Sequence, residues 1–403
     1  MLIGIPRETC PGERRVAVAP TALAHLKKAR LDVIVESGAG LEAGFTDEAY
    51  KAAGAAVGSR ADVLKADVIA SVRALGANPD RAASDLAGMH EGQALVAVMD
   101  PLSNPGPVTA AAKAGIAAFA LDLMPRITRA QSMDVLSSQA NLAGYKAVLM
   151  AAEALAKIFP MMMTAAGTIT PARVLVVGAG VAGLQAIATA KRLGAVVSGY
   201  DVRAAAKEQV ESLGARFVEL PLETGESQDS GGYAKAMDER FYQRQAELMA
   251  GVVADSDVVI TTAAVPGKRA PVIVTRAMVE GMQPGAVIVD LATERGGNCE
   301  ATVAGQTVVI NGVTVMGPLN VPSTVPFHAS QLFARNVATF LAHLCKEGSL
   351  KIDTEDEITR ETLLTQGGEV VHARVRELLG LMPLVPATPA DAPEAAVVIA
   401  GGR

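Results

Sequence analysis

The chain has 403 residues, enough for two hydrophobic cores, so we expect two domains. Half of its residues are hydrophobic but only 3% are aromatic, a composition that suits helices packed on parallel strands. The formal net charge of −6 argues against a nucleic-acid-binding protein. Three scattered cysteines, Cys10, Cys299 and Cys345, indicate a reducing compartment, with no disulfide framework and no zinc or other metal site.

Two apolar stretches are candidates for a membrane span, of which only the first approaches the required length, and we expect neither to be one. Residues Val174 to Ala190 are split into a strand and a helix by three glycines. Around Ala147 to Ile158, the charged residues Lys146, Glu153 and Lys157 interrupt the apolar run, which is typical of an amphipathic helix packed on a core. The N-terminus has early charges and no long apolar run, so it predicts a strand rather than a signal peptide.

The first 122 residues alternate short apolar strands with alanine-rich helices, which predicts a βα-repeating domain. One helix begins at Thr21 and runs to Ala29. Another begins after Pro107 and stops at Gly115, since proline suits the start of a helix and glycine its end. The expected strands are Leu2–Ile5, Asp32–Val35, Val68–Val72, Ala94–Met99 and Ala117–Ala120.

A polar segment, Leu123 to Ser138, lies between two apolar regions. Loops that hold Arg, Gln and Asp at short intervals are in some proteins functional and in others only solvated connections, and composition leaves both open. A long helix is expected from Gln139 to Phe159, ended by Pro160, and it should carry the chain into the second domain.

The second domain reads as a doubly wound parallel sheet with helices between its strands. One gap, Leu222 to Asp238, is polar and rich in Gly and Ser, so it predicts either a lid or disorder. The single Tyr233, which follows two glycines, favours a lid that folds onto a bound ligand. The expected strands are Val174–Val177, Ala195–Tyr200, Arg216–Glu219, Asp257–Thr262, Ala286–Asp290 and Val313–Met316.

A second long helix, from about Ala329 to Lys346, should return the chain to the first domain. The predicted fold class is therefore α/β, with two Rossmann-like doubly wound parallel-sheet domains joined by long helices. The cleft between them is the default ligand site. We expect a discontinuous first domain of residues 1–138 plus 325–380, a second domain of residues 139–324, and a Pro- and Ala-rich tail of residues 381–403.

The sequence V-L-V-V-G-A-G-V-A-G predicts a strand, a tight glycine turn and a helix that binds a pyrophosphate at its N-terminus. Gly178 would make the turn, Gly180 would let the backbone approach the phosphates, and Gly183 would let the helix lie close to the strand. About twenty residues later, Asp201 ends a second apolar strand, where it either accepts hydrogen bonds from a ribose or caps the next helix. Its carboxylate would repel a 2′-phosphate, which favours NAD(H) over NADP(H), although nearby Arg203 weakens that preference.

These features together resemble the alanine dehydrogenase and nicotinamide nucleotide transhydrogenase superfamily. The stretch from Arg126 to Tyr145, R-I-T-R-A-Q-S-M-D-V-L-S-S-Q-A-N-L-A-G-Y, is similar to a signature of the NAD(H)-binding component of proton-translocating transhydrogenases. The resemblance covers residues 1 to about 380. Further matching segments are 162–168, the glycine turn, 200–203, 231–235, 261–268 and 296–299.

The resemblance implies direct hydride transfer from NADH to NADP⁺, coupled to proton movement. The NADP(H) would be a co-substrate held on a partner subunit. It also implies a homodimer that works with membrane-embedded and NADP(H)-binding subunits, in the cytoplasm and peripheral to the inner membrane. A position before Met237 that is usually acidic in the family is Ala236 here, which leaves the contacts of the lid less certain.

The resemblance also assigns site residues. Arg126 would hold the carboxamide side of the nicotinamide, and Gln131 would bridge toward the other nucleotide. Asp134 and Ser137 would complete the polar loop, and Tyr233 would close from the lid. The residues implied to bind NAD(H) are Gly178, Ala179, Gly180, Val181, Gly183, Asp201, Val202, Arg203, Tyr233, Thr262, Ala263 and Ala264.

Two other functions stay open at this point. An alanine dehydrogenase must move protons and bind a carboxylate. In that subfamily a histidine lies near the strand end where this chain has Met99 and Asp100, and we interpret the five histidines as structural. Arg14 or Arg15 is either a remnant of a substrate carboxylate site or, as we prefer, a surface or dimer-contact residue. A non-enzymatic nucleotide-sensing module is the third possibility.

Overall fold

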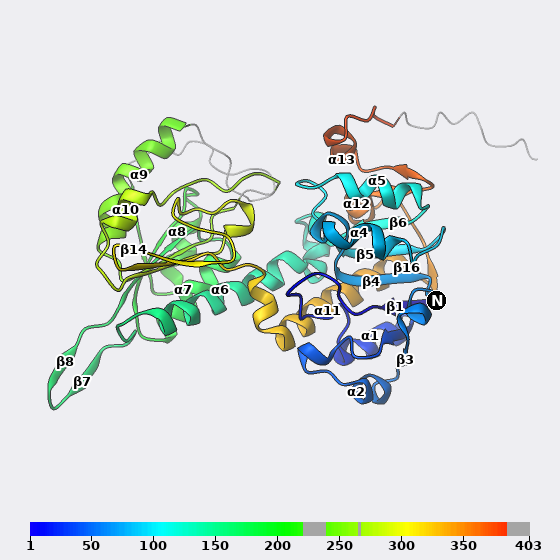
Figure 1. The fold of residues 1–403 in the computed structure, drawn as a ribbon, viewed down its shortest axis with the longest axis horizontal. Coiled ribbons are helices and arrows are strands. Elements are labelled where there is room, and N and C mark those ends of the chain that lie inside the picture. The colour runs from blue at the N-terminus through cyan, green and yellow to red at the C-terminus, as the bar shows by residue number, and fades with distance from the viewer. Residues whose placement is uncertain (221–238, 265–266, 385–403) are drawn as a thin grey trace, which may run out of the picture.

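The structure is a computed structural model that describes residues 1–220, 239–264 and 267–384. Two sheets covered by helices form two lobes, and long helices join them (Figure 1). The first lobe contains a six-stranded parallel sheet of order β3-β2-β1-β4-β5-β6. Its strands are β1 (Leu2–Ile5), β2 (Asp32–Glu36), β3 (Ala56–Gly58), β4 (Val68–Arg73), β5 (Ala94–Val98) and β6 (Ala117–Ala120).

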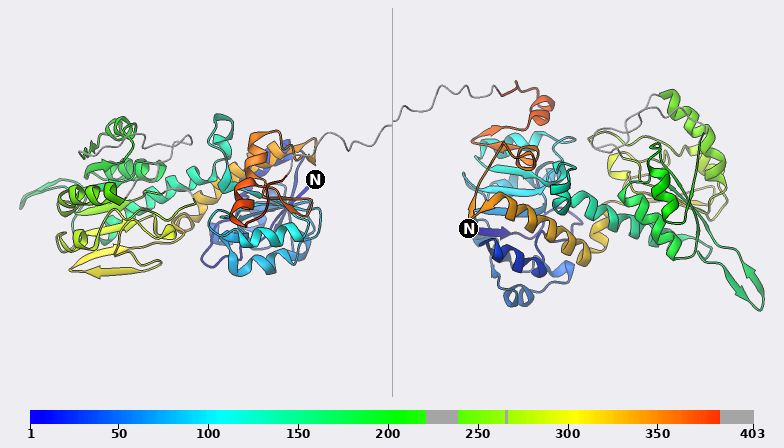
Figure 2. Two further views of the ribbon diagram at one scale, coloured as in Figure 1. Left: turned by 90° about the horizontal axis from the view of Figure 1, so that it is seen from above. Right: turned by 180° about the vertical axis from the view of Figure 1, so that it is seen from behind.

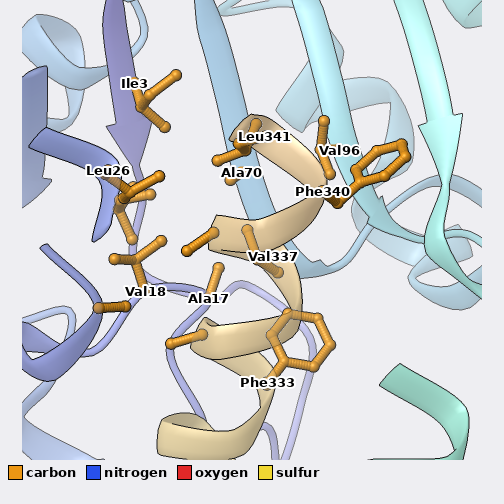
Figure 3. Close-up of a cluster of buried hydrophobic side chains, with 14 of the residues drawn as sticks. Ile3, Ala17, Val18, Leu26, Ala70, Val96, Phe333, Val337, Phe340 and Leu341 are labelled. Carbon is orange, nitrogen blue, oxygen red and sulfur yellow. The ribbon is translucent and has the colours of Figure 1, made fainter. Parts of the chain in front are cut away.

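Both faces of the first sheet are buried, as expected for parallel strands that are apolar along their whole length. On one face, Phe333, Val337, Phe340 and Leu341 of α11 (Pro326–Leu344) pack over the strands (Figure 3). The opposite face packs against α4 (Pro79–Leu86) and α5 (Gly106–Lys113). The other helices of this lobe are η1 (Pro20–Ala22), α1 (Leu23–Lys28), η2 (Leu41–Ala43), α2 (Asp47–Ala52), α3 (Arg60–Val63), η3 (Leu75–Ala77), η4 (Leu121–Leu123), α12 (Glu357–Thr362) and α13 (Ala373–Leu378).

The second lobe contains a seven-stranded sheet of order β11-β10-β9-β12-β13-β15-β14, in which only the edge strand β14 runs antiparallel. Two apolar clusters cover its faces. Its strands are β9 (Arg173–Val177), β10 (Val196–Tyr200), β11 (Arg216–Phe217), β12 (Val258–Thr261), β13 (Val287–Asp290), β14 (Thr307–Ile310) and β15 (Val313–Met316). Its helices are α7 (Val181–Arg192), α8 (Ala206–Ser212), α9 (Glu239–Ala254), α10 (Arg276–Glu280) and η6 (Thr293–Arg295).

Within the part of the chain that the structure describes, three two-stranded hairpins lie outside the two large sheets. The hairpin of β7 (Met162–Thr164) and β8 (Gly167–Ile169) projects from the second lobe (Figure 1). The other two belong to the C-terminal part of the chain and are β16 (Cys345–Lys346) with β17 (Ser349–Leu350) and β18 (Thr365–Gln366) with β19 (Glu369–Val370).

Helices α6 (Val135–Ala154) and α11 lie together where the chain passes between the lobes, and the three views agree on this (Figure 2). α6 begins earlier than predicted because the Asp134 carboxylate caps it, accepting a hydrogen bond of 2.9 Å from the Ser137 amide. It also ends earlier, since Leu155 is already extended, so the prediction that Pro160 ends this helix is wrong. α11 begins at Pro326, with proline in its first turn, rather than at Ala329, and it ends at Leu344.

α6 crosses α7 at very short range, and Gly144 makes this crossing possible. A Cβ atom on Gly144 would lie 2.0 Å from the carbonyl oxygen of Ala182, which no side chain tolerates. The crossing brings α6 directly beside the helix whose N-terminus the glycine motif predicts as the phosphate site.

The predicted α/β fold class with two Rossmann-like sheets is confirmed, and each expected strand has a counterpart in the two sheets. The sequence did not predict β3, β14 or the β7–β8 hairpin, because strands of three or four residues are too short to show a periodicity in their apolar residues. The predicted lid, Leu222–Asp238, and most of the predicted tail lie outside the described residues. Within the described ranges, no helix is both long and apolar enough to cross a membrane.

Candidate functional site

A cleft of about 920 Å³ lies between the two lobes, a size that accommodates a dinucleotide. It is lined by loops that follow the carboxyl ends of strands from both sheets, which is where open α/β sheets bind ligands. Arg73, the last residue of β4, lines the cleft. The other lining residues at strand ends follow their strands: Gly76 after β4, Asp100 after β5, Asp122 after β6, Gly178 after β9, Asp201 after β10, Thr262 after β12 and Leu291 after β13.

The glycine turn between β9 and α7 forms one wall of this cleft. Gly178 has a φ of 95°, and a Cβ atom there would lie 2.7 Å from the Thr262 hydroxyl oxygen. A Cβ atom on Gly183 would lie 1.8 Å from the carbonyl oxygen of Gly178, so this glycine allows α7 to lie against the strand. Gly180, the N-cap of α7, has open space where its Cβ would be and no side-chain capping bond. The N-terminus of α7 is therefore accessible to an anion.

Asp201 is mostly buried at the end of β10 and makes a dense set of polar contacts. Its carboxylate accepts a hydrogen bond of 2.8 Å from the Ala179 amide, within the glycine turn. It also accepts bonds from Arg203, at 2.8 Å from Nε and 2.7 Å from Nη2. The N-cap of α8 is Ala205, with no side-chain bond, so Asp201 does not cap that helix. Its carboxylate instead faces the turn, and Asp201, Val202 and Arg203 all line the cleft.

The opposite side of the turn is held by three predicted residues and by Asn298, to which the sequence analysis gave no role. Thr262, Ala263 and Ala264 line the cleft as predicted residues, and the Thr262 hydroxyl donates to the Gly178 carbonyl at 2.9 Å. Asn298, fully buried, accepts from the Ala263 amide at 2.9 Å and donates to the Ala263 carbonyl at 2.8 Å.

A buried carboxylate organises the loop that contains Asn298. Asp290 is fully buried and accepts five hydrogen bonds, from the hydroxyls of Thr261 and Thr302 and the amides of residues 292, 298 and 299. The sequence feature that could have indicated this network is an acid at the end of an apolar strand, followed closely by Gly-Gly-Asn.

The polar segment from the sequence analysis lies at the first-lobe side of the cleft. Arg126 and Ser137 line the cleft, whereas Gln131 and Asp134 do not. Gln131 is an exposed residue of η5 (Thr128–Met133). Asp134 caps α6, and its carboxylate also accepts a bond of 2.5 Å from the Ser137 hydroxyl. The structure thus places two of the four predicted loop residues in the cleft and one, Asp134, behind them as a helix cap.

Charged residues from the first lobe also line the cleft. Arg15 is buried, not at the surface as we preferred, and forms a two-bond ion pair with Glu13 at 2.8 and 2.7 Å. Burial alone would raise the pKa of Glu13, but the hydrogen bonds and charge of Arg15 lower it to about 2. Arg14 stays half-exposed, and its backbone amide donates to the Ser323 hydroxyl.

Asp122, which is partly buried, also lines the cleft. Its carboxylate accepts bonds of 2.9 Å from the amides of Met99 and Asp100. Burial raises the pKa of Asp122 to about 6, while these amide bonds oppose the shift. Tyr233, the remaining predicted site residue, lies outside the described residues. Among the residues described, no group of three or more His, Cys, Asp or Glu side chains is arranged to hold a metal ion.

Comparison with known proteins places this geometry in a family. The chain matches the family model "Alanine dehydrogenase/PNT, N-terminal domain" over residues 4–143 and "Alanine dehydrogenase/PNT, C-terminal domain" over residues 147–373. An NAD(P) transhydrogenase alpha-subunit polypeptide of Rhodospirillum rubrum is 50% identical over 377 residues, covering 92% of this chain and 98% of that protein. Alanine dehydrogenase of Bacillus subtilis is only 26% identical, over 389 residues that cover 94% of this chain and 95% of that protein.

A solved structure agrees with the sequence comparison. The crystal structure of transhydrogenase from Sinorhizobium meliloti matches with a TM-score of 0.83 and 48% identity, covering 92% of this chain and all of that one. The match therefore includes both lobes. The chain belongs to the alanine dehydrogenase/PNT family, and within it to the NAD(P) transhydrogenase alpha subunits rather than to the alanine dehydrogenases.

Proposed function

We propose that this chain is the NAD(H)-binding subunit of a proton-translocating NAD(P) transhydrogenase. In this proposal NADH lies in the cleft, and hydride passes directly to NADP⁺ held on a partner subunit. The observation that carries it is the accessible N-terminus of α7 at Gly180, at the edge of a cleft of about 920 Å³ that reaches Arg126 and Ser137. The second lobe would hold the nucleotide and the first lobe would orient its reactive ring.

The chemistry needs little more from the protein than orientation. NADH supplies the hydride when bound, and hydride transfer between two nicotinamides moves no proton at the reacting carbons. The chain must therefore fix the ring and exclude water rather than supply an acid or a base. In our proposal Arg126 and Ser137 contact the nicotinamide end. The exposed position of Gln131 suits a residue that bridges to the nucleotide of a partner.

In our proposal the Asp201 carboxylate, paired with Arg203, favours NAD(H) over NADP(H). We expect Asp201→Asn to raise the Kd for NADH by about tenfold, because a charge-assisted bond to the ribose becomes a neutral one. Arg203 would lose its carboxylate partner, so affinity for NADPH should rise. Calorimetric titration with each nucleotide measures both changes. Glu211→Gln, at an exposed position of α8, is the matched control and should change neither Kd. A variant at Asp201 that binds NADH normally would remove this role.

We also propose a homodimer, with the β7–β8 hairpin as part of its interface. Every residue of this hairpin is exposed in the single chain, including Met162, Met163 and Ile169, and so is Met161 just before it. An isolated two-stranded hairpin is at best marginally stable in water, so apolar side chains on it favour a second surface that covers them.

The dimer proposal is tested by a charge on that surface. Met163, 78% exposed, is replaced by Asp, and light scattering after size-exclusion chromatography measures the mass. We expect the mass to fall from that of a dimer to that of a monomer, because a buried unpaired carboxylate is costly. Leu41→Asp, at another exposed apolar residue, is the control and should leave the mass unchanged. A dimer that survives Met163→Asp would contradict the role of the hairpin.

In this account the membrane-embedded part and the NADP(H) site belong to partner subunits, and the chain is cytoplasmic and peripheral to the inner membrane through them. The test is calorimetric titration with NADH and NADPH, followed by addition of membranes that contain the partner subunits. We expect NADH binding by the chain alone and hydride transfer only after the partners are added. The alternative is an NAD-dependent alanine dehydrogenase, which the lower identity to that subfamily disfavours. Robust pyruvate formation from alanine and NAD⁺ without a partner would favour it.

A further inference from the structure

Two consecutive residues of η6, Glu294 and Arg295, reach from the second lobe to the first across the cleft. The Arg295 guanidinium donates from Nη2 to one carboxylate oxygen of Asp100 at 2.7 Å and from Nη1 to the other at 3.1 Å. Nη1 also donates to the Ser103 hydroxyl. This parallel two-bond arrangement fixes the orientation of both groups as well as their separation.

Glu294 makes a second contact between the lobes, in which the acid lies on η6 and the base on the first lobe. Its carboxylate accepts a bond of 3.4 Å from Nη2 of Arg73, at the end of β4 in the first lobe, and one of 2.7 Å from the Asn320 amide. Arg73 also contacts the Asn320 side-chain oxygen at 3.1 Å. η6 thus presents an acid to a first-lobe base and a base to a first-lobe acid. This pattern allows only one alignment of η6 against the first lobe, because exchanging the partners would place like charges together.

The first-lobe partner of Arg295 is held in an unusual backbone conformation. Asp100 has a φ of 46°, a left-handed value that residues other than glycine seldom adopt. The two amide bonds to the Asp122 carboxylate, from Met99 and Asp100, hold it there. A strained residue persists only where its surroundings fix it. Asp122 therefore aims the Asp100 carboxylate at Arg295.

The η6 side of the contact is fixed as well. The turn follows Asp290, whose carboxylate accepts bonds from the amides on both sides of η6. Gly296 ends η6 with a φ of 95°, and a Cβ atom on Gly297 would lie 2.7 Å from that carboxylate. Both ends of the Asp100–Arg295 pair are thus preorganised on rigid elements.

The position of the four charges gives them a role. Arg73, Asp100, Glu294 and Arg295 all line the cleft, whereas the covalent connections between the lobes run through α6 and the segment that enters α11. Asp100 and Arg295 stay about a quarter and a third exposed, and ion pairs of this kind contribute little to folding stability. The contact can therefore open to admit a ligand without unfolding either lobe.

We propose that the Asp100–Arg295 and Arg73–Glu294 pairs form an interlobe clasp that sets the width of the cleft. Asp100 and Arg295 are then positioning residues: they place the first-lobe loop of Arg126 and Gln131 against a nucleotide held by the second lobe. The functional part of this inference rests on the proposed transhydrogenase activity, whereas the structural part does not.

The structural part is tested by measuring the distance between the lobes. Spin labels are attached to cysteines introduced at Lys113 in α5 and Glu208 in α8, both exposed, with Cys10→Ser as background and the buried Cys299 and Cys345 retained. We expect one narrow distribution for the distance within a protomer of the parent protein, measured with labelled chains diluted into unlabelled ones so that distances between protomers do not contribute. Arg295→Gln should broaden and lengthen that distribution, and Arg295→Glu should do so more strongly.

Two further variants test whether the effect on the distance depends on the Asp100–Arg295 charge pair. Asp100→Lys combined with Arg295→Glu should restore a narrower distribution than either single variant. Arg276→Gln, which removes an exposed arginine of α10 in the same lobe, should leave the parent distribution unchanged. If the reversed pair failed to fold, high salt applied to the parent protein would supply the same test, since screening should broaden the distribution. Identical distributions in the parent and both Arg295 variants would overturn the clasp.

The functional part is read in the complex with the partner subunits. We expect Arg295→Gln to lower the hydride-transfer rate about tenfold while the Kd for NADH changes less than about threefold, since misplacement affects the reaction more than binding. An unchanged rate with an altered distance distribution would overturn the positioning role. If no variant and no parent protein transferred hydride, the proposed function would fail while the distance measurement still decided the clasp.

Discussion

Replacing Gly180 by valine is expected to leave the fold intact and to abolish NADH binding. The open space at its Cβ position and its φ of −78° allow a side chain there without a clash. In our proposal that same space is where the pyrophosphate approaches the N-terminus of α7, so the valine methyl groups would displace it and leave the helix amides without their anion. We expect the Kd for NADH to rise on the order of 100-fold, which is about 2.8 kcal/mol of binding free energy.

The experiment combines calorimetric titration with a thermal melt of the protein without ligand. Gly251→Val, in α9, is the matched control, because a Cβ atom there also meets open space but lies away from the cleft lining. It should bind NADH as the parent protein does. If Gly180→Val melted normally and still bound NADH, the dinucleotide would not use this turn. Substitution of Gly183 would be less informative, since its Cβ would collide with the Gly178 carbonyl and disturb the fold itself.

Gln131→Asn is expected to separate binding from reaction. Gln131 is exposed and does not line the cleft, so shortening its side chain should leave the Kd for NADH within about twofold of the parent value. If Gln131 bridges to the nucleotide of a partner subunit, moving its amide back by one methylene should slow hydride transfer by about tenfold in the reconstituted complex. Stopped-flow measurement under single-turnover conditions reads the transfer step directly.

A second variant is the control for a Gln-to-Asn substitution that has nothing to do with the site. Gln209→Asn makes the same chemical change at an exposed position of α8 and should leave the transfer rate unchanged. Normal transfer by Gln131→Asn would remove the role that we assign to this residue. Slower transfer with normal NADH affinity would also exclude a module that only senses the nucleotide, because such a module needs no reactive geometry.

The sequence was sufficient for the parts of the fold that depend on periodicity and on glycine. The strand–turn–helix at Gly178 to Gly183 was predictable because a tight turn, an open helix end and close packing of the helix on the strand each require glycine at a fixed spacing. The apolar strands of both sheets were predictable for the same kind of reason, since a strand buried on two faces has few alternatives to a continuous apolar run.

Most of the rest depends on contacts between residues distant in the chain, and one error came from a local side chain to which we assigned the wrong role. Arg15 follows another arginine in a charged loop, and its burial involves Gln139 and Asn320, two residues distant in the chain that accept hydrogen bonds from its guanidinium. The start of α6 depended on Asp134, which we had assigned to the nucleotide site rather than to a helix cap. Asp290 and Asn298 form their network only once several strand ends meet, so their role was not visible in the sequence.

The central claim is that hydride passes directly from NADH in this cleft to NADP⁺ on a partner subunit. The most direct test follows deuterium from stereospecifically labelled NADH in the complex of this chain with membranes that contain the partner subunits. We expect the label to appear in NADPH, with none released to water and no transfer when this chain is omitted. Label that appears in the solvent, or NADPH that forms at the same rate without this chain, would contradict the account.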